Sequence, residues 1–102
     1  MMLLFGEKYC ICAKDDTSGR SGWFVFKISR RAGAYRAYVL ERPSLNGRDS
    51  SLSKVHMLRD GNRYYVCVLG SVSTVDKMKA IARLWAKRYL RYAETGKDYN
   101  AK

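Results

Sequence analysis

The stretch that decides the fold is residues 73–95, which read STVDKMKAIARLWAKRYLRYAET. It is the only long segment in which apolar residues recur with the period of an α-helix. The apolar face consists of Val75, Met78, Ile81, Ala82, Trp85, Ala86, Tyr89, Tyr92 and Ala93. This pattern predicts one long helix over residues 75–95, with the side chain of Trp85 buried on its apolar face.

Both ends of the predicted helix carry local signals. Ser73 and Asp76 resemble a capping box, which makes Ser73 the expected N-cap. Gly96 follows the last periodic residue and is a typical C-terminal stop. Leu84 and Leu90 fall outside the apolar face, so we expect them to be exposed unless a neighbouring loop covers one of them.

A stripe of cations follows the other side of the predicted helix. It comprises Lys79, Arg83, Lys87 and Arg91, bordered by Lys77 and Arg88. Like charges four residues apart repel by about 0.2–0.5 kcal/mol per pair in an exposed helix. The only acids in the segment are Asp76 and Glu94. We therefore predict that the stripe contacts an anionic ligand, the alternative being an ordinary solvated helix face.

The residues before the helix read as β-strands, of which WFVFKIS at 23–29 is the clearest because it is aromatic and β-branched. Its alternation places Phe24, Phe26 and Ile28 on one face and Trp23, Val25 and Lys27 on the other. We expect Phe24 and Phe26 to face the core. The other expected strands are residues 2–5 with 8–14 (a hairpin or one bent strand), 35–41, 55–58 and 63–69. We predict an α+β fold in which an antiparallel meander of about five strands packs against the helix. Residues 1–96 form one domain, followed by a polar tail at 97–102.

A second group of cations lies in the predicted hairpin at residues 23–42. It contains Lys27, Arg30, Arg31, Arg36 and Arg42, interleaved with Trp23, Tyr35 and Tyr38. Cations beside aromatic rings are typical of surfaces that bind nucleic acid, since every base can stack on a ring. Trp23 and Tyr38 are therefore candidate base contacts, although aromatic residues on strands also serve as core or cross-strand partners.

Residues 60–86, DGNRYYVCVLGSVSTVDKMKAIARLWA, contain a turn, a strand, a Ser/Thr cap and a helix. This arrangement resembles the end of AP2-type and integrase arm-binding DNA-binding domains. The resemblance implies a sheet backed by a helix, with the sheet entering a DNA groove. On this reading Lys27, Arg36 and Arg63 contact the DNA.

The overall charge narrows the class of partner. The chain has 20 Lys and Arg against 9 Asp and Glu, for a net charge of +11. Such a surplus favours polyanions. We predict a small nucleic-acid-binding protein, with DNA favoured over RNA and no membrane association. The alternative is a docking module, a regulator or inhibitor of the mobile-element type, that presents a basic surface to an acidic protein.

Three cysteines, Cys10, Cys12 and Cys67, are an odd number for a disulfide framework. They predict a reducing, cytoplasmic compartment and buried free thiols that act as small apolar groups. A zinc site with His56 lacks a recognised ligand spacing. We therefore expect neither a metal nor a cofactor.

Catalytic signatures are missing from the sequence. His56 is the only histidine, and no phosphate-binding glycine loop, HExxH or CxxC occurs. We predict that the protein is not an enzyme, the minor alternative being a nuclease built on scattered acids.

Overall fold

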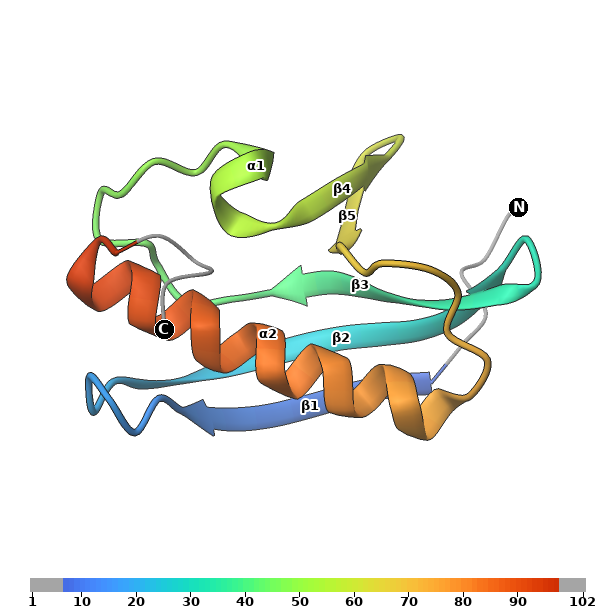
Figure 1. The fold of residues 1–102 in the computed structure, drawn as a ribbon, viewed down its shortest axis with the longest axis horizontal. Helices are drawn as coiled ribbons and strands as arrows, with labels where there is room; N and C mark the ends of the chain where they lie inside the picture. The colour runs from blue at the N-terminus through green and yellow to red at the C-terminus, as the bar shows by residue number, and fades with distance from the viewer. Residues whose placement is uncertain (1–6, 98–102) are drawn as a thin grey trace.

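The computed structural model describes residues 7–97, which form one antiparallel sheet with a long helix across one face (Figure 1). The strands are β1 (Glu7–Lys14), β2 (Ser21–Arg31), β3 (Ala34–Glu41), β4 (Met57–Asp60) and β5 (Arg63–Val66). A short helix, α1 (Leu52–Val55), precedes β4, and the long helix α2 (Val75–Thr95) follows β5. The predicted α+β class is confirmed. The predicted strand at 2–5 and residues 98–102 of the tail lie outside the described residues.

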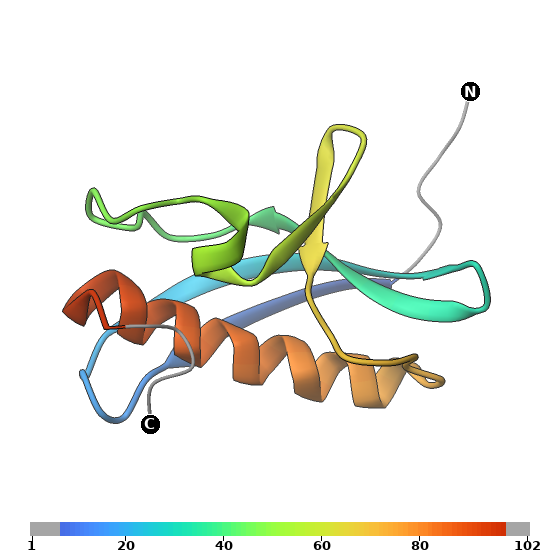
Figure 2. The ribbon, with the colours of Figure 1, turned by 45° about the horizontal axis from the view of Figure 1, so that its top comes forward.

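The order of the strands departs from a simple meander at its far edge. The order is β1-β2-β3-β5-β4, so only the first three strands follow the chain. The chain passes through α1 to the outer edge, forms β4 there, and returns as β5 beside β3. β5 joins β3 where Tyr38 faces Tyr65. The β4–β5 hairpin therefore rises away from the plane of the first three strands (Figure 2).

The boundaries of α2 agree with the helix predicted at 75–95, but its N-cap is Thr74 and not Ser73. Thr74 has an extended backbone, and its hydroxyl accepts a hydrogen bond from the Lys77 N–H at 3.1 Å. That bond satisfies one of the donors left open by the first turn. At the other end Gly96 is left-handed, with φ of 72°, and its N–H donates to the Tyr92 carbonyl. Gly96 is thus the predicted stop.

Trp85 is the centre of the core. Its side chain is 2% exposed and packs edge-on against the rings of Phe24 and Phe26. Its Nε1–H donates to the carbonyl of Val55 at 2.9 Å, which fastens α1 to the same side of the sheet as α2. The buried position predicted for Trp85 and the inward face predicted for β2 are both confirmed.

The two leucines outside the apolar face behave differently. Leu84 is 51% exposed, as expected. Leu90 is fully buried, so the alternative left open for one of the two leucines applies to it. Its side chain packs beside the start of β2 at Gly22, where the missing side chain of glycine leaves room for it.

The cysteines are free and exposed, so the prediction of buried thiols is also wrong. Cys10 and Cys12 alternate with the buried Ile11 and Ala13 along β1. They lie on the sheet face away from α2, and within residues 7–97 neither helix covers that face of β1 and β2. Among residues 7–97, no group of three or more His, Cys, Asp or Glu side chains is placed to hold a metal ion. No helix in the described part of the chain has the length and apolar character needed to span a membrane.

Candidate nucleic-acid interface

The first half of the predicted helix stripe contacts the edge strand β1. Lys79 forms an ion pair with Glu7, and its Nζ lies 5.2 Å from the centre of the Tyr9 ring. The pairing with Glu7 raises the pKa of Lys79. Arg83 donates from Nη2 to the Tyr9 hydroxyl at 3.1 Å. These residues therefore hold the helix to the sheet edge as well as carrying positive charge.

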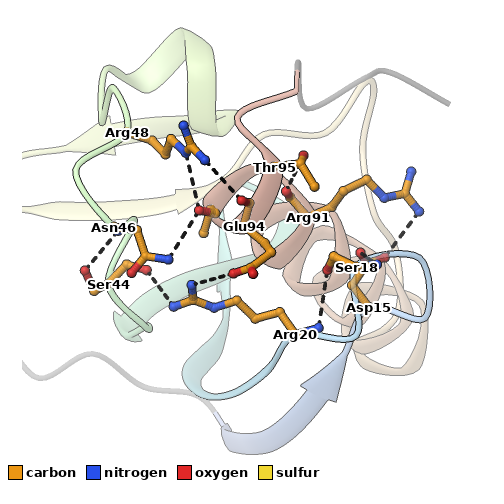
Figure 3. A network of polar contacts seen from close by, with 10 residues as sticks. Asp15, Ser18, Arg20, Ser44, Asn46, Arg48, Arg91, Glu94 and Thr95 are labelled. Carbon is orange, nitrogen blue, oxygen red and sulfur yellow. Dashed lines mark hydrogen bonds and ion pairs between the residues drawn. The ribbon is translucent and has the colours of Figure 1, made fainter.

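The last cation of the stripe contacts the loop after β1 (Figure 3). Arg91 Nη2 lies 3.2 Å from Asp15 Oδ1 and 3.0 Å from Thr17 Oγ1. Asp15 is only 2% exposed and also accepts a hydrogen bond from the Ser18 N–H. Ion pairs with Asp15 and Glu7 relieve the like-charge repulsion along α2. The spacing of the cations therefore does not require a phosphate backbone to explain it.

Asp15 makes the stability of this corner depend on pH. Its burial by itself would raise the pKa, but the hydrogen bonds from Ser18 and the charge of Arg91 outweigh burial, and the pKa falls below its usual 3.8. A lowered pKa stabilises the fold at pH values above the unfolded pKa, and this stabilisation disappears as the pH falls through the folded pKa. Asp15→Asn should therefore lower the melting temperature at neutral pH and flatten its decline below about pH 5. An identical acid profile in the variant would contradict this assignment.

Other arginines are used to close the C-terminal end of α2 (Figure 3). Arg48 donates from Nη2 to the Glu94 carbonyl at 3.0 Å and from Nε to the Ala93 carbonyl at 3.4 Å. Arg20 pairs with the Glu94 carboxylate at 3.3 Å and donates to the Ser44 carbonyl. Cations at a helix C-terminus interact favourably with its dipole. Part of the charge surplus is therefore structural.

The face of the sheet away from α2 forms the second candidate surface, here called the open face. α2 lies on one side only of β1, β2 and β3 (Figures 1 and 2). The register brings one residue from each strand into a row across this face: Lys8, Lys27, Tyr38, Tyr65 and Leu58. Lys8 lies directly opposite Lys27. Like charges in that position destabilise a sheet unless something neutralises them.

Apolar groups are exposed further along β2 and β3. Trp23 is 68% exposed and faces Cys12 across the β1–β2 ladder. Leu40, at the irregularity between β2 and β3, is 46% exposed. The predicted placement of Trp23 opposite the core face is confirmed, and its ring is accessible to a ligand.

Aromatic and charged side chains gather where the β4–β5 hairpin meets β3. Tyr38 is fully buried, and its hydroxyl donates to Asp60 Oδ2 at 2.9 Å. The Arg63 guanidinium lies 5.3 Å from the centre of the Tyr38 ring. The ring of Tyr65, which belongs to the β4–β5 hairpin, also packs against the Tyr38 ring. Tyr38 therefore has no free ring face on which a base can stack, contrary to its predicted role.

Asp60 is the carboxylate on which this cluster converges. Arg36 lies 3.4 Å from it and stacks over the Tyr65 ring at 4.2 Å, and Arg31 lies 3.7 Å away. The hydrogen bond from Tyr38, then the charges of the arginines, hold the pKa of Asp60 below its usual range. Several cations around one carboxylate leave the cluster with a net positive charge.

The predicted residues are thus divided between surfaces. Lys27, Arg31, Arg36, Arg63 and Trp23 share the open face, while Arg30 alternates with them and falls on the helix side of β2. Arg88 lines a separate groove, described below. Sequence reasoning missed Lys8, Lys14 and Tyr65, which complete the open face. The alternation of β1 could have indicated the two lysines, because they share a strand face with Cys10 and Cys12.

Comparison of the chain with known proteins identified no relative. The chain matches no protein-family model, and searches among curated proteins and solved structures also gave no match.

Proposed function

We propose that this protein binds nucleic acid, with duplex DNA favoured over RNA, through the open face of its sheet. The observation that carries the proposal is the pair of lysines, Lys8 and Lys27, directly opposite each other on an uncovered face. Further cations on that face are Lys14, Arg31, Arg36 and Arg63, against the acids Glu41 and Asp60. Phosphates would neutralise this excess and relieve the repulsion.

The position of the cations on a β-sheet favours a duplex as the ligand. The major groove of B-DNA is wide enough for a two-stranded β-ribbon, and arginine and lysine read guanine there. Trp23, exposed on the same face of β2 as Lys27, supplies an apolar surface for thymine methyl groups. The resemblance of residues 60–86 to AP2-type domains implies the same face. Lys27, Arg36 and Arg63 are the predicted contacts on either argument.

The helix stripe is the weaker of the two surfaces. Lys79 and Arg91 each have a carboxylate of their own, and Arg83 bonds to Tyr9. On the open face, by contrast, Arg31 and Arg36 share the single carboxylate of Asp60. The remaining role of the helix stripe is to add positive charge beside the sheet edge. A comparison of variants on the two surfaces therefore tests the location of the site.

Binding should be measured by fluorescence anisotropy with labelled duplex DNA, single-stranded DNA and RNA at several salt concentrations. The double variant Lys8→Gln/Lys27→Gln should bind duplex more weakly, with a salt slope reduced by about 0.9 for each phosphate that the variant no longer neutralises. Its fold should survive or improve slightly because the like-charge pair is gone. Arg83→Gln/Lys87→Gln, which removes the same charge from α2, should change affinity and slope much less. If both double variants weakened duplex binding equally, the net charge of the protein alone would explain the binding, and the open face would not be the site.

A variant that is expected to increase the affinity for duplex DNA strengthens the test. Asp60→Asn keeps an oxygen that accepts the Tyr38 hydrogen bond but removes the negative charge from the open face. It should bind duplex more tightly than the natural chain in the same assay. Unchanged or weaker binding by a folded Asp60→Asn variant would place the ligand elsewhere. Tighter binding to RNA or single strands than to duplex would overturn the preference for DNA.

A further inference from the structure

A groove runs between α2 and the chain segment that follows β5. Its volume is about 450 Å³. Ile81, Leu84 and Trp85 form its helix side, and Val66, Val68 and Leu69 form the other. The lining is therefore mainly apolar, and no residue on it belongs to the open face.

The two largest exposed apolar side chains of this region lie at the groove. Leu69 is completely exposed, at 101%, and Leu84 is 51% exposed. Isolated apolar residues are common on protein surfaces, but apolar residues gathered at a hollow mark an interaction site. The apolar surface also continues out of the hollow onto Leu69. A small molecule that filled the groove would leave Leu69 in water, whereas a longer segment of chain would cover it.

Among the described residues that line the groove, the ones that can carry charge at neutral pH are basic. Arg88 and His56 lie on its lining, which contains no acid. Lys77 lies on the same helical stripe as Ile81, Leu84 and Arg88, because residues three and four apart share a face. A partner segment that carries carboxylates beside its apolar anchor would complement these cations. A second copy of this chain is a poor occupant, since each copy has a net charge of +11.

We propose that this groove docks an acidic segment of a partner protein, with one large apolar side chain in the hollow and Asp or Glu residues beside Arg88 and Lys77. Nucleic acid is a poor occupant because the apolar floor offers nothing to phosphates. The groove lining contains none of the lysines and arginines of the open face. Substitutions at one surface therefore test that surface without removing the charges of the other.

The test uses the full chain and a displayed library of random linear peptides. The selected sequences should combine a large apolar residue with flanking Asp or Glu. A fluorescent synthetic copy of a selected peptide should then bind in anisotropy measurements. Leu84→Glu should weaken that binding roughly tenfold or more, as expected for a central apolar contact. Arg88→Gln should weaken it less, and Lys27→Gln on the open face should leave it unchanged.

Leu84 and Leu69 are exposed, so neither substitution should alter the melting temperature. If Leu84→Glu nevertheless unfolds the chain, Leu69→Ser provides the same test on the other wall of the groove. The proposal is overturned if no peptide is enriched, if the enriched peptides lack acids, or if binding survives both substitutions. A dimer at high protein concentration that Leu84→Glu dissolves, seen by sedimentation, would show that a second copy is the occupant and would also overturn it.

Discussion

Replacing Trp85 with alanine is expected to lower the free energy of unfolding by about 3–5 kcal/mol, a large share of the stability of a small domain. The indole contacts Phe24, Phe26 and Tyr89, so its removal leaves a cavity between the helix and the sheet. It also removes the donor to the Val55 carbonyl and detaches α1 from the core. Urea denaturation followed by circular dichroism measures the change.

A matched control and an intermediate variant sharpen this prediction. Leu84→Ala, one residue away on the exposed side of α2, should change stability by less than about 0.5 kcal/mol. Trp85→Phe keeps much of the ring packing but leaves the Val55 carbonyl without its partner, so it should fall between the two. A denaturation midpoint unaffected by Trp85→Ala would mean that α2 presents a different face to the sheet.

Gly22→Ala is expected to destabilise the protein by about 1–3 kcal/mol, although the change adds a single methyl group. A Cβ at this position would lie 2.5 Å from Pro43 Cγ and 3.4 Å from Leu90 Cδ2. The proline ring is rigid, so the backbone must shift to admit the methyl group. Without this contact, alanine would be stabilising by about 0.4–1 kcal/mol because it restricts the unfolded chain. The sign of the change in stability therefore shows whether the added methyl group meets Pro43.

The same substitution in a Pro43→Ala background separates these effects. Removing the proline ring removes the overlap, so Gly22→Ala should there be neutral or stabilising. Ser21→Ala, at an exposed neighbouring position, serves as the control for the start of β2. Equal destabilisation by Gly22→Ala in both backgrounds would show that Pro43 is not the obstacle. Thermal denaturation of the four variants completes the cycle.

The limits of α2, the burial of Trp85 and the inward face of β2 could be predicted from the sequence because they depend on neighbours within a few residues. A helical period and a terminal glycine set the register of α2 through local hydrogen bonds. Alternation along β2 separates Phe24, Phe26 and Ile28 from Trp23 for the same reason. At the start of α2 the error, Ser73 in place of Thr74, is a displacement of a single residue between two hydroxyls that can both cap. Elsewhere the short helix α1 was missed, and the strand expected at 63–69 ends at Val66.

The candidate site could be predicted only in part. Lys27, Arg36, Arg63 and Trp23 could be found because strand alternation and charge are visible in the sequence. Lys8 lies opposite Lys27 only in the observed pairing of β1 with β2. A shift of one residue in that pairing would turn the side chains of β1 to the other face of the sheet. Tyr38 was predicted to be available to a base, but the β4–β5 hairpin covers it.

Taken alone, the sequence determined the fold class, the long helix and the excess of positive charge. Only the tertiary structure decided which charges remain available to a ligand. Arg91 meets Asp15 and Lys79 meets Glu7 across more than seventy residues of chain, and Leu90 finds its space beside Gly22. An ion pair or a packing contact depends on distance through space, which the folded sheet sets and which periodicity along the chain does not contain.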